Sequence, residues 1–108
     1  MKRYLISAAT IAAFAAAFPL AHTPDTQWSY ASGTSNIVAR CAARAIGKTG
    51  EDFAAFMQTE LFGPLGMTSA IPKFDDAGTF IGSSFVYATA RDFARFGYLY
   101  LRDGVWED

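Results

Sequence analysis

Hydrophobic residues recur at helical spacing in three stretches of this chain, each lying between residues that start and stop helices. The first stretch begins near Thr34 or Ser35, both good N-cap residues, and ends at Gly47, a natural C-terminal stop. The apolar side of this predicted helix comprises Ile37, Val38, Cys41 and Ala45.

A second helix is predicted directly after the first. Thr49 and Asp52 have the spacing of a capping box, with Asp in place of Glu, and Pro64 and Gly66 close the stretch. The apolar stripe of this helix comprises Phe53, Phe56, Met57 and Leu61.

A third helix is predicted to start at Thr89 and Asp92, again at capping-box spacing, and to end at Gly104. Its buried side is expected to comprise Phe93, Phe96, Tyr100 and Leu101. Its opposite side is expected to comprise Arg91, Arg95, Tyr98 and Arg102. Gly97 lies inside this helix, where glycine costs about 1 kcal/mol relative to alanine. A close contact with another helix would explain this glycine.

The segment between the second and third helices predicts a turn and a short extended segment. Residues 75–78 form a turn cluster, and residues 79–87 are aromatic and β-branched. The chain thus predicts three or four helices joined by structured loops, with little strand. The predicted fold class is mainly α.

The first 18 residues allow two interpretations. Lys2 and Arg3 precede an uncharged, alanine-rich stretch over residues 4–18, which fits a signal peptide. This stretch is too short for a stable membrane span, which needs about 20 apolar residues. The alternative is an alanine-rich helix of the domain, stopped by Pro19. The first interpretation predicts a periplasmic or secreted protein, and the second a cytoplasmic one.

Composition narrows the classes of function. The 108 residues suffice for one small domain, and 52% of them are hydrophobic, which argues against disorder. The net charge is −1 with no basic cluster, so no nucleic-acid partner is expected. His22 and Cys41 are the only residues of their types, which excludes an intrachain disulfide and a usual zinc site. No metal or cofactor is therefore expected. Cys41 is expected to be a small structural hydrophobe. His22 could belong to a Ser-His-Asp triad, but a solvated loop residue is favoured.

Two motifs that resemble catalytic sequences have simpler explanations. The Gly-Lys-Thr-Gly sequence at residues 47–50 lacks the earlier glycine and the preceding strand of a phosphate-binding loop. It also joins two predicted helices, whereas the Lys-Thr-Gly of penicillin-recognising enzymes belongs on a sheet strand. It is therefore predicted to be an interhelical turn. Ser-x-x-Lys is absent, because Ala45 and Ala70 stand three residues before Lys48 and Lys73.

The sequence Trp-Ser-Tyr-Ala-Ser-Gly at residues 28–33 places Tyr30 two residues before Ser32, in a turn that opens a helix. A tyrosine at such a turn can direct its hydroxyl toward a cleft. The alternative is a half-buried tyrosine that packs against the turn. Ser32 could be an ordinary turn serine.

Three stretches together resemble the serine β-lactamase and penicillin-binding-protein superfamily, closest to its class C-like branch with esterases and 6-aminohexanoate-dimer hydrolases. They are residues 19–33, the Leu-Phe-Gly-Pro-Leu-Gly-Met-Thr-Ser sequence at residues 61–69, and residues 82–97 with Ala-Thr-Ala-Arg-Asp-Phe-Ala-Arg-Phe-Gly. One departure lies in the first stretch, where a turn that usually reads Pro-Gly reads Pro24-Asp25. The turn is therefore expected to differ in geometry.

The resemblance implies an acyl-serine mechanism acting on an ester, amide or lactam. Tyr30 matches the proton-transferring tyrosine, and Ser32 matches the third position of its Tyr-x-Ser motif. A phenol ionises near pH ~10 in water, so such a base needs cations beside it. The nucleophile is expected before, and the Lys-Thr-Gly strand after, the residues present. Residues 1–108 are thus expected to be a partial domain, an internal fragment of the helical region of an α/β β-lactamase-like fold. It would be inactive alone and would self-associate through exposed apolar faces.

Two other hypotheses remain open at this point. The basic and apolar N-terminus and the absent nucleophile also fit a small non-enzymatic helical protein, exported and acting through contacts. A truncated gene product with no function of its own is the third.

Overall fold

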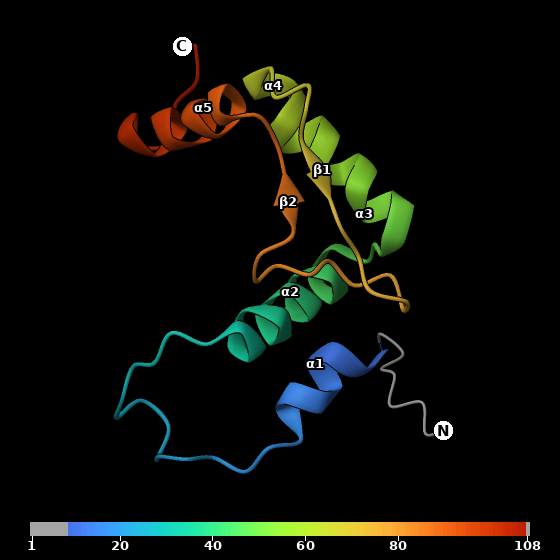
Figure 1. Ribbon diagram of the computed structural model, residues 1–108, viewed down its shortest axis with the longest axis vertical. Helices are drawn as coiled ribbons and strands as arrows, with labels where there is room; N and C mark the ends of the chain where they lie inside the picture. The colour runs from blue at the N-terminus through green and yellow to red at the C-terminus, as the bar shows by residue number, and fades with distance from the viewer. Residues whose placement is uncertain (1–8, 108) are drawn as a thin grey trace.

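The computed structural model describes residues 9–107, which form a mainly α fold with one short antiparallel hairpin (Figure 1). The elements are α1 (Ala9–Ala16), α2 (Ser32–Ile46), α3 (Gly50–Met57), the π-helical turn η1 (Gln58–Phe62), α4 (Gly63–Leu65), β1 (Ile71–Pro72), β2 (Val86–Tyr87) and α5 (Ala90–Leu101). α3, η1 and α4 follow one another without a break and make one long helical segment. The predicted fold class is confirmed.

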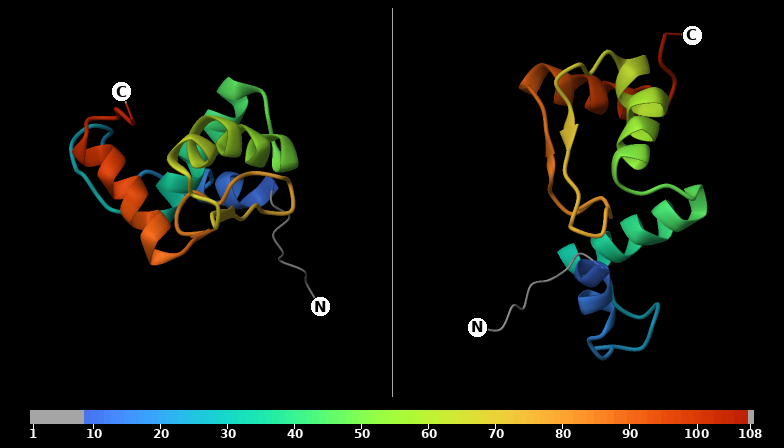
Figure 2. Two further views of the ribbon diagram at one scale, coloured as in Figure 1. Left: turned by 90° about the horizontal axis from the view of Figure 1, so that it is seen from above. Right: turned by 90° about the vertical axis from the view of Figure 1, so that its right-hand side faces the viewer.

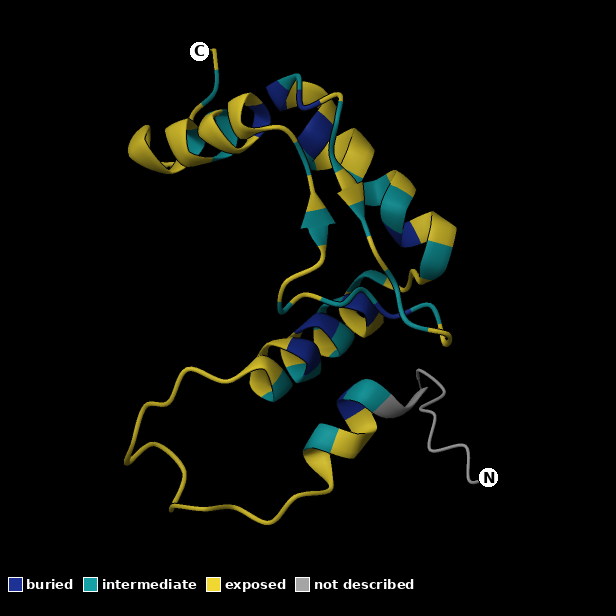
Figure 3. Cartoon of the chain, in the orientation of Figure 1, coloured by how far each residue is buried: buried dark blue, intermediate teal, exposed yellow. Residues whose placement is uncertain are grey.

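α1 lies beside α2 at one end of the molecule, and α4 and α5 lie at the other (Figures 1 and 2). α3 and the hairpin strands run between these ends. The connection between α1 and α2, residues 17–31, swings away from the rest of the chain and is exposed throughout (Figure 3).

α1 is a short alanine-rich helix that packs on the start of α2. Ala12 is buried, and a Cβ placed on Gly33 would lie 3.1 Å from the Cβ of Ala15. Small residues therefore allow the two helices to approach closely. The helix ends before Pro19, as the helical interpretation of this stretch predicts. Lys2 and Arg3 lie outside the described residues.

α2 begins earlier than predicted and buries a different face. It starts at Ser32 rather than at residues 34–35, and it ends as predicted at Gly47, which adopts a left-handed φ of 75°. The face predicted to be buried is wrong, because Val38 and Cys41 are exposed. The buried residues of α2 are Asn36, Ala39 and Ala43. Alanines are favoured there because the loop after β1 approaches closely: a Cβ on Gly82 would lie 3.2 Å from the Cβ of Ala39.

The long segment from α3 to α4 carries the main core. Phe62, Leu65 and Met67 are buried, with Phe96 and Leu99 of α5 packed against them. The predicted stripe is confirmed in part, since Phe53 is buried and Phe56, Met57 and Leu61 are half-buried. Thr49 is the N-cap residue as predicted, but its side chain makes no capping hydrogen bond.

The hairpin is shorter than the predicted extended segment. Ile71 pairs with Tyr87 and Pro72 with Val86, and one further bridge joins Phe74 to Phe80. The predicted turn at residues 75–78 is confirmed. The Asp75 carboxylate accepts hydrogen bonds from the backbone N–H groups of residues 77 and 79. Phe53, Phe74 and Phe80 form a second apolar cluster, with ring centroids 6.0–6.2 Å apart.

The predicted orientation of α5 is confirmed only in part: Phe96 packs against the core, and Arg91, Tyr98 and Arg102 are exposed, as predicted. Asp92 is buried and Arg95, Phe96 and Leu99 are half-buried, whereas Phe93, Tyr100 and Leu101 are exposed. The polar side of α5 faces inward, because the side chains of Asp92 and Arg95 form hydrogen bonds with the loop after α4. The contact predicted at Gly97 is also not found: nothing in the described residues lies within 4 Å of a Cβ placed there.

Large apolar side chains are exposed along the whole chain. They include Phe14, Phe18, Leu20, Trp28 and Val38 near α1 and α2, and Phe93, Tyr100 and Leu101 on α5. We expect strong fluorescence enhancement of a hydrophobic dye by the folded chain at neutral pH, because contiguous apolar surface binds such dyes. A sharp, monomeric thermal transition without dye binding would contradict this expectation.

Gly66 provides a test of the backbone at the end of α4. Its φ is 71°, and an added Cβ would lie 2.8 Å from Nη1 of Arg95, whose guanidinium donates a 2.6 Å hydrogen bond to the Gly66 carbonyl. Gly66→Ala should therefore lower the free energy of unfolding by about 1–2 kcal/mol or more, measured by denaturant titration. The exposed neighbour provides the control: Thr68→Ala should change it by less than about 0.5 kcal/mol. Equal effects of both variants would exclude a special role for Gly66.

Candidate functional site

Tyr30 lies in an extended segment immediately before α2, with 82% of its surface exposed. Its ring contacts that of Trp28, with centroids 6.5 Å apart. Within the described part of the chain its hydroxyl makes no hydrogen bond. The half-buried alternative is therefore wrong, and the phenol is presented to solvent.

Ser32 is the first residue of α2 and is also exposed. The N-cap residue, Ala31, has no side-chain acceptor for the N–H groups of the first turn. Tyr30 thus lies next to the positive end of a 15-residue helix, where a negative charge is favoured.

Asp25 lies in the turn before this segment and adopts a left-handed φ of 65°, a conformation that favours glycine. Asp tolerates this conformation better than most residues with a side chain.

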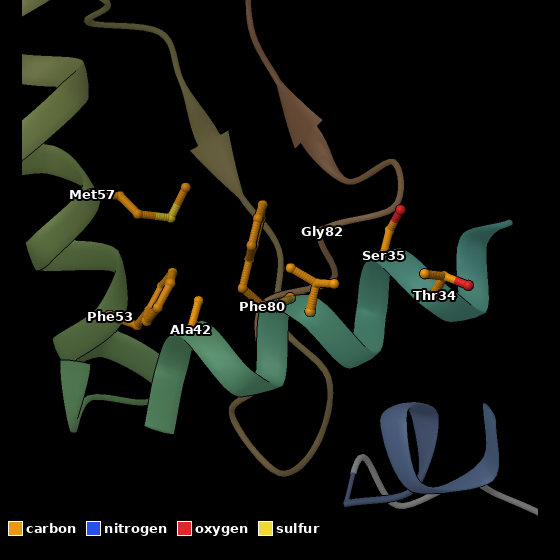
Figure 4. Close-up of a pocket in the computed structure, with 9 residues that line it drawn as sticks. Thr34, Ser35, Ala42, Phe53, Met57, Phe80 and Gly82 are labelled. Atoms are coloured by element: carbon orange, nitrogen blue, oxygen red, sulfur yellow. The ribbon is translucent and has the colours of Figure 1, made fainter. Parts of the chain in front are cut away.

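An open hollow of about 470 Å³ lies between α2, α3 and the Phe80–Gly82 segment (Figure 4). Its walls are mostly carbon, from Ala42, Phe53, Met57 and Phe80 among others, and the hydroxyls of Thr34 and Ser35 lie at one end. Tyr30 and Ser32 are not among the residues that line it.

The side chain of Ser69 joins the loop after α4 to the start of α5. Its hydroxyl donates to Oδ2 of Asp92 at 2.5 Å and accepts from the backbone N–H of Thr89 at 2.9 Å. The Ser69 backbone N–H donates to the same carboxylate oxygen at 2.9 Å. Thr89 caps α5 as predicted, accepting from the Asp92 N–H at 3.2 Å. The second half of the capping box is replaced, because Ser69 rather than Asp92 satisfies the Thr89 N–H.

These bonds hold the Asp92 carboxylate in its ionised form. The hydrogen bond from the Ser69 hydroxyl lowers the pKa of Asp92 below its usual 3.8, and the Ser69 backbone N–H and the charge of Arg95 lower it further. Burial acts in the opposite direction.

A third link joins α2 to the loop that contains Ser83. Nδ2 of Asn36 donates to the Ser83 hydroxyl at 3.3 Å, and Asn36 is only 7% exposed. Its Oδ1 is buried with no partner in the described residues.

A family model described as Beta-lactamase matches residues 1–106. The chain belongs to the β-lactamase family. No curated protein and no solved structure matches the chain.

The links described above connect the three stretches on which the β-lactamase resemblance rests. Residues 61–69 are joined to residues 82–97 by two hydrogen bonds, from the Ser69 hydroxyl to Asp92 and from Arg95 to the Gly66 carbonyl. Asn36, just after the first stretch, donates a hydrogen bond to Ser83. In the sequence, Ser69 and Ser83 were notable only as members of the stretches 61–69 and 82–97, Asp92 was notable as a cap residue, and Asn36 carried no prediction. Asn36 lies on one helical face with Ala39 and Ala43, three and seven residues further on, and this face of small residues is the signal that could have identified it.

The remaining candidates have no catalytic surroundings. His22 is exposed in the loop before α2, and Cys41 is a free, exposed thiol rather than the buried hydrophobe predicted. Residues 47–50 form the predicted turn between α2 and α3. Among residues 9–107, no group of three or more His, Cys, Asp or Glu side chains could hold a metal ion. In the same residues no helix is long and apolar enough to cross a bilayer.

The Asp92 network makes stability depend on acid pH. The lowered pKa means that the folded state favours the carboxylate, so this contribution is complete above the ordinary value of 3.8 and is lost as the pH falls below it. Asp92→Asn should flatten the fall of the melting temperature in this acid range. Asp76→Asn, in the exposed hairpin turn, should leave the wild-type pH profile unchanged. Parallel profiles for wild type and Asp92→Asn would overturn the assignment.

Proposed function

We propose that this chain contributes the proton-transferring tyrosine of a β-lactamase-like serine hydrolase that cleaves an ester, amide or lactam through an acyl-serine. Tyr30 would act as the base, and Ser32 would occupy the third position of its motif. The nucleophilic serine and its lysine would come from a segment outside these 108 residues, because no Ser-x-x-Lys occurs in them.

The single observation that carries the proposal is the exposed Tyr30 at the N-terminal end of α2, in a chain matched by the family model over residues 1–106. A core tyrosine could not reach a substrate, whereas this hydroxyl has no partner among the described residues. The cations that a tyrosine base needs would accompany the nucleophile.

The chain alone should not turn over substrate. We expect no hydrolysis of a chromogenic ester or a chromogenic cephalosporin, and no mass increase with a penicillin, because acyl transfer needs a nucleophile that Tyr30 does not supply. Turnover that Tyr30→Phe abolishes and Tyr87→Phe preserves would refute inactivity while retaining the role of the tyrosine. Tyr87 is the matched control because it is another exposed tyrosine.

The role of Tyr30 can be tested if the DNA upstream encodes Ser-x-x-Lys in frame. The joined protein should form an acyl-enzyme with a fluorescent penicillin or ester, visible by intact mass. In that protein Tyr30→Phe should lower kcat by about 10²–10⁴, the usual contribution of a general base. An unchanged kcat, with Tyr87→Phe also unchanged, would remove Tyr30 from the mechanism.

A further inference from the structure

A second hollow, of about 280 Å³, lies in the C-terminal half of the molecule, and we call it the core hollow. Its walls come from the helical segment that runs from α3 into η1, from the loop after α4, from the hairpin and from α5 (Figure 1). It shares only Met57 and Phe80 with the hollow of Figure 4. The lining side chains are four phenylalanines, two methionines, Leu61 and Val86.

Water is a poor occupant of the core hollow. No nitrogen or oxygen atom of the described residues contributes to its walls. A buried water needs two to four polar partners, so an apolar cavity stays dry and takes apolar molecules instead. An apolar cavity of about 150 Å³ is large enough for benzene, so the core hollow can accommodate a ring that carries a substituent.

The walls favour an aromatic occupant in particular. Phe62 and Phe93 both border the core hollow, and neither makes a ring contact with another aromatic residue among residues 9–107. Phe80, in contrast, already stacks on Phe53 with ring centroids 6.0 Å apart. An aromatic molecule in the hollow would give Phe62 and Phe93 the ring partner that they lack. The buried thioether of Met67 adds a group that makes favourable contacts with ring edges.

The core hollow is preformed and has an entrance. The hydrogen bonds from Ser69 to Asp92 fix the first turn of α5, and Phe93 is the next residue along this helix. Phe93 is 46% exposed and is the only lining residue that is exposed rather than half-buried or buried. Its ring therefore marks the side of the hollow that is open to solvent. A preformed apolar site of this kind is typical of sites for small molecules.

We propose that the core hollow binds one small, uncharged aromatic molecule, with its ring between Phe62 and Phe93. A charged group is not expected inside, because burying a charge without a polar partner is costly. The inference does not depend on the proposed function, because neither Tyr30 nor Ser32 borders the core hollow.

Nuclear magnetic resonance of the full chain with ethylbenzene tests the site. The methyl group of Met67 should shift in a saturable manner, because Met67 borders the core hollow and does not border the hollow of Figure 4. Its resonance can be assigned with Met67→Leu. Benzoate, a charged aromatic molecule of similar size, should leave this resonance unchanged at the same concentration. A Met67 resonance that ethylbenzene does not move would overturn the proposal.

Two matched valine variants locate the bound molecule. Val86→Phe should occupy part of the core hollow and weaken the affinity for ethylbenzene at least about tenfold. Val38→Phe is the control, because Val38 is 60% exposed and lines only the hollow of Figure 4, so the affinity should persist. Circular dichroism should show wild-type helix content in both variants, and Leu61→Phe replaces Val86→Phe if that variant does not fold. Unchanged affinity in the folded core-hollow variant, or a loss confined to Val38→Phe, would place the molecule elsewhere and overturn the proposal.

Discussion

The carboxylate of Asp92 is the point on which the C-terminal half of the molecule depends. It is buried at the first turn of α5 and is held by the hydroxyl and the backbone N–H of Ser69, which come from the loop after α4. One turn along α5, Arg95 donates to the carbonyl of Gly66 in the same loop. A buried carboxylate without such donors would be costly, so the loop and the helix can only be placed together. This requirement, rather than the number of apolar residues, sets which side of α5 faces the core.

The same constraint explains the apolar surface of the molecule. Once Asp92 faces inward, Leu101 must face outward, because it lies on the opposite side of the helix. Phe93 and Tyr100 lie between these two sides and are left partly exposed. At the opposite end of the chain, small residues control the packing: Ala39 allows Gly82 to approach α2, and Ala15 allows α1 to approach Gly33. The molecule has a core centred on Phe62, Leu65 and Met67, and several of its large apolar side chains lie at the surface.

The location of Tyr30 is consistent with a role that is completed elsewhere. The links through Ser69, Arg95 and Asn36 fix the frame of the β-lactamase-family stretches, whereas residues 17–31 extend from that frame and are exposed. In the proposed role, Tyr30 lies just before α2, and the nucleophile and its lysine come from residues outside this chain, since no Ser-x-x-Lys occurs in it.

Local chemistry in the sequence determined where the elements lie and which family the chain resembles. Helix ends at Gly47 and Gly66, the cap at Thr89 and the turn at Asp75 depend on backbone conformation and hydrogen bonds a few residues apart, so neighbouring residues suffice to predict them. The faces of α2 and α5 could not be predicted in this way. Periodicity places apolar residues on one side of a helix, but the buried side was decided by distant polar partners, Ser83 for Asn36 and Ser69 for Asp92. Only the tertiary structure brings those partners together. Burying the charged Asp92 without these donors would cost more than the burial of one apolar side chain gains, which favours the polar contacts at α5.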